Sequence, residues 1–153
     1  MEIIKTDIEG VVLLKPHVFR DDRGSICEAF SERAFGEMVG SVHFVQDNES
    51  HSRQGVVRGL HYQLHPAAQS KLVRVSSGAI LDIAVDIRRG SPTFGQHVAV
   101  ELSAENGLQL FIPRGFAHGF VALSREAVVQ YKCDNFYSPE HERGIAFDDP
   151  RLG

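Results

Sequence analysis

The sequence has little of what marks disulfide-rich, membrane-embedded or nucleic-acid-binding proteins. Its two cysteines, Cys27 and Cys133, are far apart and form no metal-binding pair. We interpret them as reduced thiols, with a disulfide as the alternative. No apolar run approaches the roughly 18 residues that a membrane helix needs. The net charge of −4 argues against a nucleic-acid backbone as the main partner.

The first residues, Met1–Asp7, also lack the apolar stretch and the cleavage site of a signal peptide. We therefore expect a cytoplasmic location, with neither a membrane nor a nucleic acid as partner. Hydrophobic residues make up 42% of the 153 residues and charged residues 24%, which is ordinary for a globular protein. The length suits one domain over residues 1–153, without linkers or repeats.

Short apolar runs separated by turn residues dominate the chain and predict an all-β sandwich or barrel. Residues 79–87 are the clearest strand, because Leu81 and Ile83 alternate with Asp82 and Ala84. One short helix is expected over residues 32–39, after the possible cap Ser31. The other expected strands are residues 10–14, 43–46, 56–63, 71–75, 97–102, 108–112, 118–122 and 127–133.

The segment from Arg58 to Lys71 carries the strongest chemical signal. His61 and Gln63 share one strand face, since residues two apart point the same way. An unperturbed imidazole titrates at roughly pH 6.5, so His61 can exchange protons near neutrality. The two cations can hold a phosphate or a developing oxyanion. Charged residues are rarely buried without partners, so this cluster, with Gln63 as a substrate contact, predicts a lined cavity rather than a closed core.

A metal site is a competing interpretation, because Pro113–His118 has the spacing of the second metal motif of cupins. A metal would need two more imidazole or carboxylate ligands on the partner strand. That strand offers His61 but then Gln63, and Gln69 further on, and an amide is a poor ligand for a transition metal. We therefore expect no metal and interpret His118 as a hydrogen-bonding residue of the cavity.

Tyr131 is the candidate proton donor. An ordinary phenol has a pKa near 10 and is protonated at neutral pH, so it can act as a general acid. Packing in the core or at an interface is the alternative for this side chain. We expect Asp82, His61 and Tyr131 to face one lumen. Tyr137 is interpreted as a rim residue that stacks on a planar base, again with packing as the alternative.

These residues belong to segments that together resemble the dTDP-4-dehydrorhamnose 3,5-epimerase family. The resemblance covers nearly the whole chain in the family's order. Its segments are Arg58–Gln63, Lys71–Val75, Asp82–Gly95, Glu101–Asn106, Ile112–Phe120, Gln130–Lys132 and Tyr137–Gly144.

The resemblance implies a cupin-type β-jelly roll (a double-stranded β-helix) with one or two short helices, which forms a homodimer. It also implies an isomerase without a metal or other cofactor. The implied substrate is a thymidine-diphosphate (dTDP) 4-keto-6-deoxyhexose on a rhamnose-type biosynthetic route. His61 matches the family's base, Tyr131 its proton donor and Lys71 the cation beside the 4-keto oxygen. The nucleotide-sugar contacts match Arg23, Glu28, Gln46, Asp47, Asn48, Arg58, His118 and Glu142, and the thymine-stacking aromatic matches Tyr137.

The family's reaction agrees with these residue types. A C4 ketone acidifies the hydrogens on C3 and C5, so His61 can remove one and leave an enolate. Lys71, with Arg58, would stabilise the enolate oxygen. A proton returned to the opposite face by Tyr131 inverts the carbon, and no redox cofactor is needed.

Members of this family usually continue beyond the position where this chain ends. Their tail typically carries a Lys near the nucleotide and an acidic residue bonded to the catalytic His. An orienting carboxylate fixes the imidazole tautomer, and we expect Asp82 to take that role for His61. The sequence leaves open whether it is a piece of a longer chain, a short member of the family or a member with reduced activity.

Alternatives of two classes stay open at this point. Within the family, the enzyme inverts only C3 or only C5, or moves the keto group between C3 and C4. The presence of both His61 and Tyr131 favours epimerisation over keto transfer. Outside catalysis, the chain is a cupin that binds a nucleotide sugar. A metal-dependent dioxygenase-type cupin is a more distant alternative.

Overall fold

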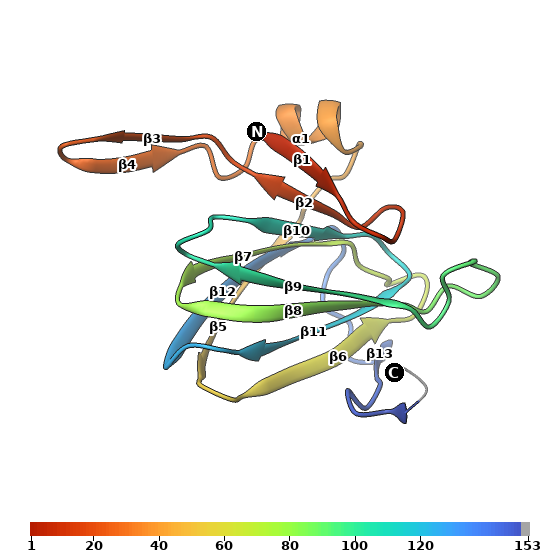
Figure 1. Ribbon diagram of the computed structural model, residues 1–153. Coiled ribbons are helices and arrows are strands. Elements are labelled where there is room, and N and C mark those ends of the chain that lie inside the picture. The colour runs from red at the N-terminus through yellow and green to blue at the C-terminus, as the bar shows by residue number, and fades with distance from the viewer. Residues whose placement is uncertain (151–153) are drawn as a thin grey trace.

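The protein is an all-β roll in the computed structural model, which describes residues 1–150 (Figure 1). Two antiparallel sheets face each other, as the sequence predicts. The six-stranded sheet has the order β1 (Glu2–Lys5), β2 (Val12–Lys15), β10 (Gln109–Ile112), β7 (Lys71–Ser77), β12 (Glu126–Cys133) and β5 (Gln46–Arg53). The five-stranded sheet has the order β13 (Glu142–Gly144), β6 (Val57–Gln63), β11 (Phe116–Ala122), β8 (Ala79–Asp86) and β9 (His97–Ser103).

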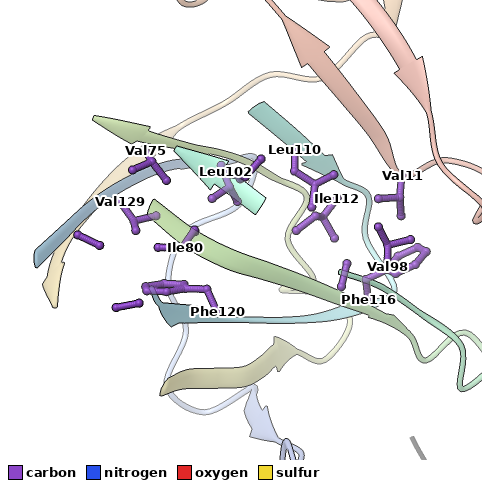
Figure 2. Close-up of a cluster of buried hydrophobic side chains, with 14 of the residues drawn as sticks. Val11, Val75, Ile80, Val98, Leu102, Leu110, Ile112, Phe116, Phe120 and Val129 are labelled. Carbon is purple, nitrogen blue, oxygen red and sulfur yellow. The ribbon is translucent and has the colours of Figure 1, made fainter. Parts of the chain in front are cut away.

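The hydrophobic core fills the space between the sheets (Figure 2). Alternate residues of each strand point inward, so Val75 and Val129 of one sheet meet Ile80 and Phe120 of the other. All four side chains are buried. At β5 and β6, by contrast, the inward positions are largely polar, and the two sheets enclose a cavity there instead of closing into core.

One helix, α1 (Glu32–Met38), packs on the outside of the six-stranded sheet. It begins where predicted, because the Ser31 hydroxyl accepts a hydrogen bond from the Ala34 amide at 3.3 Å. Phe35 is its buried residue and joins an aromatic cluster with Phe111 of β10. The helix therefore covers the outer face of β10 and leaves the outer face of β12 and β5 uncovered.

Several strands differ from the sequence prediction. The run at residues 43–46 lies outside the sheet, and β5 occupies Gln46–Arg53 instead. That strand is almost entirely polar, so hydrophobicity gave no sign of it. The expected charged turn at residues 20–28 is a hairpin, β3 (Val18–Asp21) with β4 (Gly24–Cys27), which projects from the body of the roll (Figure 1). The short strands β1 and β13 were not expected either.

Both cysteines are free thiols, Cys27 exposed on the hairpin and Cys133 buried in β12. Within residues 1–150, no helix is long and apolar enough to cross a membrane.

Candidate active site

A cavity of about 720 Å³ opens between the two sheets. This volume is within the range of small-molecule sites. Its walls come from β5 and β12 on one sheet and from β6 and β11 on the other. The sequence-predicted residues that line it are Gln46, Asn48, Arg58, His61, Gln63, Lys71, His118, Tyr131, Tyr137 and Glu142.

The two candidate proton-transfer residues come from opposite sheets. His61 lies on β6 of the five-stranded sheet, and Tyr131 lies on β12 of the six-stranded sheet. The His61 side chain is 53% exposed, so a ligand can reach it. Burial raises the pKa of Tyr131, which keeps the phenol protonated at neutral pH. A substrate in the cavity would therefore have a base on one side and a proton donor on the other.

Lys71 supplies a cation beside the proton donor. Its Nζ lies 5.6 Å from the centre of the Tyr131 ring. Burial lowers the pKa of Lys71, although the charges of Asp82 and Glu142 oppose this shift. Cys133 lies opposite Lys71 in the strand register, but burial raises the pKa of its thiol to about 11. The thiol stays neutral, so it does not neutralise the ammonium group.

Arg58 adds a second cation, and β5 holds it in place. Its Nε donates to the Ser52 hydroxyl at 2.9 Å, and another guanidinium nitrogen donates to the His51 carbonyl at 3.3 Å. Two donors are thereby used on the protein, and the remaining ones are available for an anion. A guanidinium fork fixed in this way suits a phosphate or an enolate oxygen.

The expectation that Asp82 orients His61 is wrong. Asp82 is fully buried on β8, and its Oδ1 lies 2.6 Å from Nε2 of His118. The carboxylate close to His61 belongs to Glu142, whose Oε1 is 3.6 Å from His61 Nδ1. The strand register explains the difference: His118 stands between His61 on β6 and Ala84 on β8, so it intercepts the Asp82 side chain.

Gln63 lines the cavity, but its amide is already fully bonded within the protein. Its Nε2 donates to the carbonyls of Ala67 and Phe136 at 2.7 and 3.2 Å, and its Oε1 accepts from the Ser138 amide at 2.8 Å. The expected substrate contact is therefore corrected, because no donor of this amide is left over. Gln63 instead fixes the rim loop that carries Tyr137.

Three predicted contacts lie outside the cavity of this chain. Asp47 points to the outer face of β5 and pairs with Lys132 at 3.0 Å. Arg23 lies at the tip of the projecting hairpin and pairs with Asp21 at 2.7 Å. Glu28 directly follows the hairpin, at its base. None of the three is among the residues that line the cavity.

Other lining residues were not predicted. Ser50 lies on β5 two residues after Asn48, and strand alternation would have identified it had β5 been recognised. Gly59 and Gly119 let β6 and β11 approach closely, since a Cβ on Gly59 would lie 2.6 Å from the Gly119 Cα. The Gly59 φ of +113° also favours glycine. Neither signal is legible in a single sequence.

Across residues 1–150, no group of three or more His, Cys, Asp or Glu side chains is placed to hold a metal ion. What the cavity offers is proton transfer between fixed side chains, with cations beside the site of negative charge. The fold and the cavity thus define an acid–base isomerase on a jelly roll.

Comparison with known proteins identifies the family. The profile described as dTDP-4-dehydrorhamnose 3,5-epimerase matches residues 5–153. The chain belongs to this family of epimerases, and its fold is the cupin-type jelly roll of the family's solved structures.

Two relatives and one solved structure illustrate the similarity. The dTDP-4-dehydrorhamnose 3,5-epimerase of Shigella flexneri is 57% identical over 153 residues, which are 99% of this chain and 84% of the relative. The enzyme of the same name from Pseudomonas aeruginosa is 55% identical, with the same coverage of both chains. A Legionella pneumophila dTDP-6-deoxy-D-glucose-3,5-epimerase, solved with dTDP-4-keto-L-rhamnose, has a TM-score of 0.96 and 49% identity over 99% of this chain and 80% of its own.

Proposed function

We propose that the cavity inverts C3 and C5 of a dTDP-4-keto-6-deoxyhexose, as a step in making a rhamnose-type deoxysugar. The observation that carries the proposal is the position of His61 and Tyr131 on opposite sheets of one cavity. Inversion requires a proton to leave one face of a carbon and another to arrive on the opposite face. A base and an acid on facing walls meet that requirement.

The His61 imidazole takes the proton from C3 or C5. The electrons of the C–H bond form the enolate double bond, and the carbonyl electrons move to the C4 oxygen. Lys71 and Arg58 stabilise that oxygen, and fixed donors of this kind are worth about 3–4 kcal/mol each in other enzymes. Tyr131 then gives its proton to the opposite face of the carbon and restores the ketone, and solvent resets both side chains.

The nucleotide end of the substrate lies along the rim. Tyr137 is 57% exposed and presents its ring for stacking on the base. The Tyr137 backbone amide donates to Gln46 Oε1 at 2.9 Å, and Gln46 Nε2 donates to Asn48 Oδ1 at 3.1 Å. This pair of amides holds the stacking residue against β5. Arg58 and His118 face the diphosphate, and the expected cytoplasmic location stays a prediction.

The experiment that tests this function uses the 4-keto-6-deoxyglucose nucleotide as substrate in heavy water. We expect deuterium at both C3 and C5 of the product, because each inversion exchanges a carbon-bound proton with solvent. NMR of the product measures both positions and the configuration. Deuterium at one carbon only would identify a single-centre epimerase, a shifted carbonyl a ketoisomerase, and no deuterium a binding protein.

We also propose that the site is completed by a second copy of the chain. Arg23 and Glu28 are nucleotide-sugar contacts by family resemblance, yet they lie on and beside a hairpin that projects from the body of this chain (Figure 1). Phe19 and Ile26 face each other across that hairpin and are 62% and 73% exposed. Docking the hairpin on a partner would cover this apolar pair and bring Arg23 to the partner's cavity.

A subunit-mixing experiment tests this arrangement. Arg23→Ala and His61→Asn each inactivate every site of their own homodimer. In a mixed dimer, the Arg23→Ala chain keeps its own His61 and receives Arg23 from its partner, so one of two sites is intact. Random mixing should therefore restore about a quarter of the wild-type sites. Activity after refolding the two variants together measures this, and an absence of recovery would place Arg23 at the cavity of its own chain.

A further inference from the structure

Glu142 contacts two residues of the cavity with its two carboxylate oxygens. Oε2 accepts a hydrogen bond from the Tyr137 hydroxyl at 2.8 Å, and Oε1 lies 3.6 Å from His61 Nδ1. Strand β13 sets this position, because it pairs with the edge of β6 and places Glu142 opposite Gln63 and Gly144 opposite His61 (Figure 1). The carboxylate therefore lies between the rim and the candidate base.

We propose that Glu142 is the positioning residue of His61, and that the Tyr137 hydroxyl fixes Glu142 in place. The inference rests on the proposed function, since it assigns how the base of that reaction is oriented. Glu142 then acts through His61 rather than as a direct contact to the nucleotide sugar. The rim residue that stacks on the nucleotide base and the base that removes the proton become linked through one carboxylate.

The chemistry follows from the two imidazole nitrogens. A carboxylate facing Nδ1 favours the tautomer that carries its hydrogen there, and Nε2 is then left with a lone pair for the substrate proton. The same negative charge stabilises the imidazolium that forms during the reaction. The contact is now an ion-pair distance. Both side chains are partly exposed, and a bound substrate would displace water and strengthen their interaction.

The other carboxylate near this site is already committed. Asp82 is bonded to His118 and lies behind it, away from the open part of the cavity. Among the ion pairs of residues 1–150, the one that includes His61 is with Glu142. In addition, the hydrogen bond to Glu142 raises the pKa of Tyr137. That shift gives an independent way to see the contact in solution.

The link gives the nucleotide a role in the chemistry. A base stacked on Tyr137 restricts its ring, and the hydroxyl then holds Glu142 in one orientation toward His61. Binding energy from a remote part of the substrate is thereby used to orient the catalytic base. A sugar lacking the nucleotide should consequently lose turnover as well as affinity.

The test compares Glu142→Gln and Tyr137→Phe with the control Glu140→Gln, which removes an exposed carboxylate from the same loop. We expect kcat to fall about 10- to 100-fold for Glu142→Gln, because part of the general-base contribution is lost. Tyr137→Phe keeps the stacking ring and should lose less, and the control should match wild type. Titration of Tyr137 by ultraviolet absorbance should show its pKa falling toward the ordinary value in Glu142→Gln.

A second measurement uses the ligand-free protein. Nitrogen-15 NMR of His61 should show the Nδ1–H tautomer in wild type and its loss in Glu142→Ala. A raised KM with unchanged kcat, together with an unchanged tautomer, would overturn the proposal and leave Glu142 as a substrate contact. Failure of the proposed function would look different: wild type would then incorporate no deuterium, whatever tautomer His61 adopts.

Discussion

Replacing His61 with Asn should abolish solvent exchange at both C3 and C5 of the substrate. Asn keeps a polar side chain of similar reach, but it cannot accept and hold a proton at neutral pH. A positioned general base contributes about 10²- to 10⁴-fold to the rate, and this whole contribution should be lost. Deuterium incorporation followed by NMR measures the loss directly, because it reports proton removal even when no product forms.

The matched control is His43→Asn. His43 is exposed, and its ion pair with Glu32 at 3.2 Å is also exposed, so this variant should exchange at the wild-type rate. Binding of dTDP by the His61 variant should also stay within a few-fold of wild type, since His61 faces the sugar. Retention of exchange at either carbon would assign that carbon to another base and divide the proposed mechanism between two residues.

The residues of the catalytic pair were accessible from sequence because they sit in apolar strands. β6 and β12 alternate clearly enough that the inward faces of His61 and Tyr131 can be assigned without a structure. β5 was misplaced for the opposite reason. Its sequence, Gln46–Arg53, is polar on both faces, because one face lines a cavity and the other lies on the uncovered side of the sheet. Hydrophobic alternation is absent from a strand that has no core to face.

The positions of the carboxylates could not be read from sequence, because they depend on register between strands. Asp82 and His61 face the same space, but His118 lies opposite His61 on the intervening strand and takes the Asp82 oxygen. Glu142 approaches His61 through β13, which has three residues and no hydrophobic pattern. A strand that short is defined by the edge it joins, which is a tertiary property. The hairpin residue Arg23 is a similar case, since its destination depends on a second chain.

Replacing Tyr131 with Phe should separate exchange from inversion. The phenyl ring can still pack against Lys71 and His118, whose groups lie 5.6 and 6.3 Å from the Tyr131 ring centre, so the cavity should keep its shape. The variant lacks the hydroxyl proton that the buried phenol retains because burial raises the pKa of Tyr131. His61 can still form the enolate and return a solvent-derived proton to the face from which the first one left.

We therefore expect deuterium to enter the substrate without a change of configuration. Formation of the inverted product should fall about 10²- to 10⁴-fold, the contribution of a general acid, while exchange falls by much less. NMR of one reaction mixture gives both rates, and calorimetric binding of dTDP checks that the rim is intact. Equal loss of exchange and inversion would place Tyr131 in the proton-removal step with His61, because a donor that acts only after the enolate has formed cannot slow the formation of that enolate.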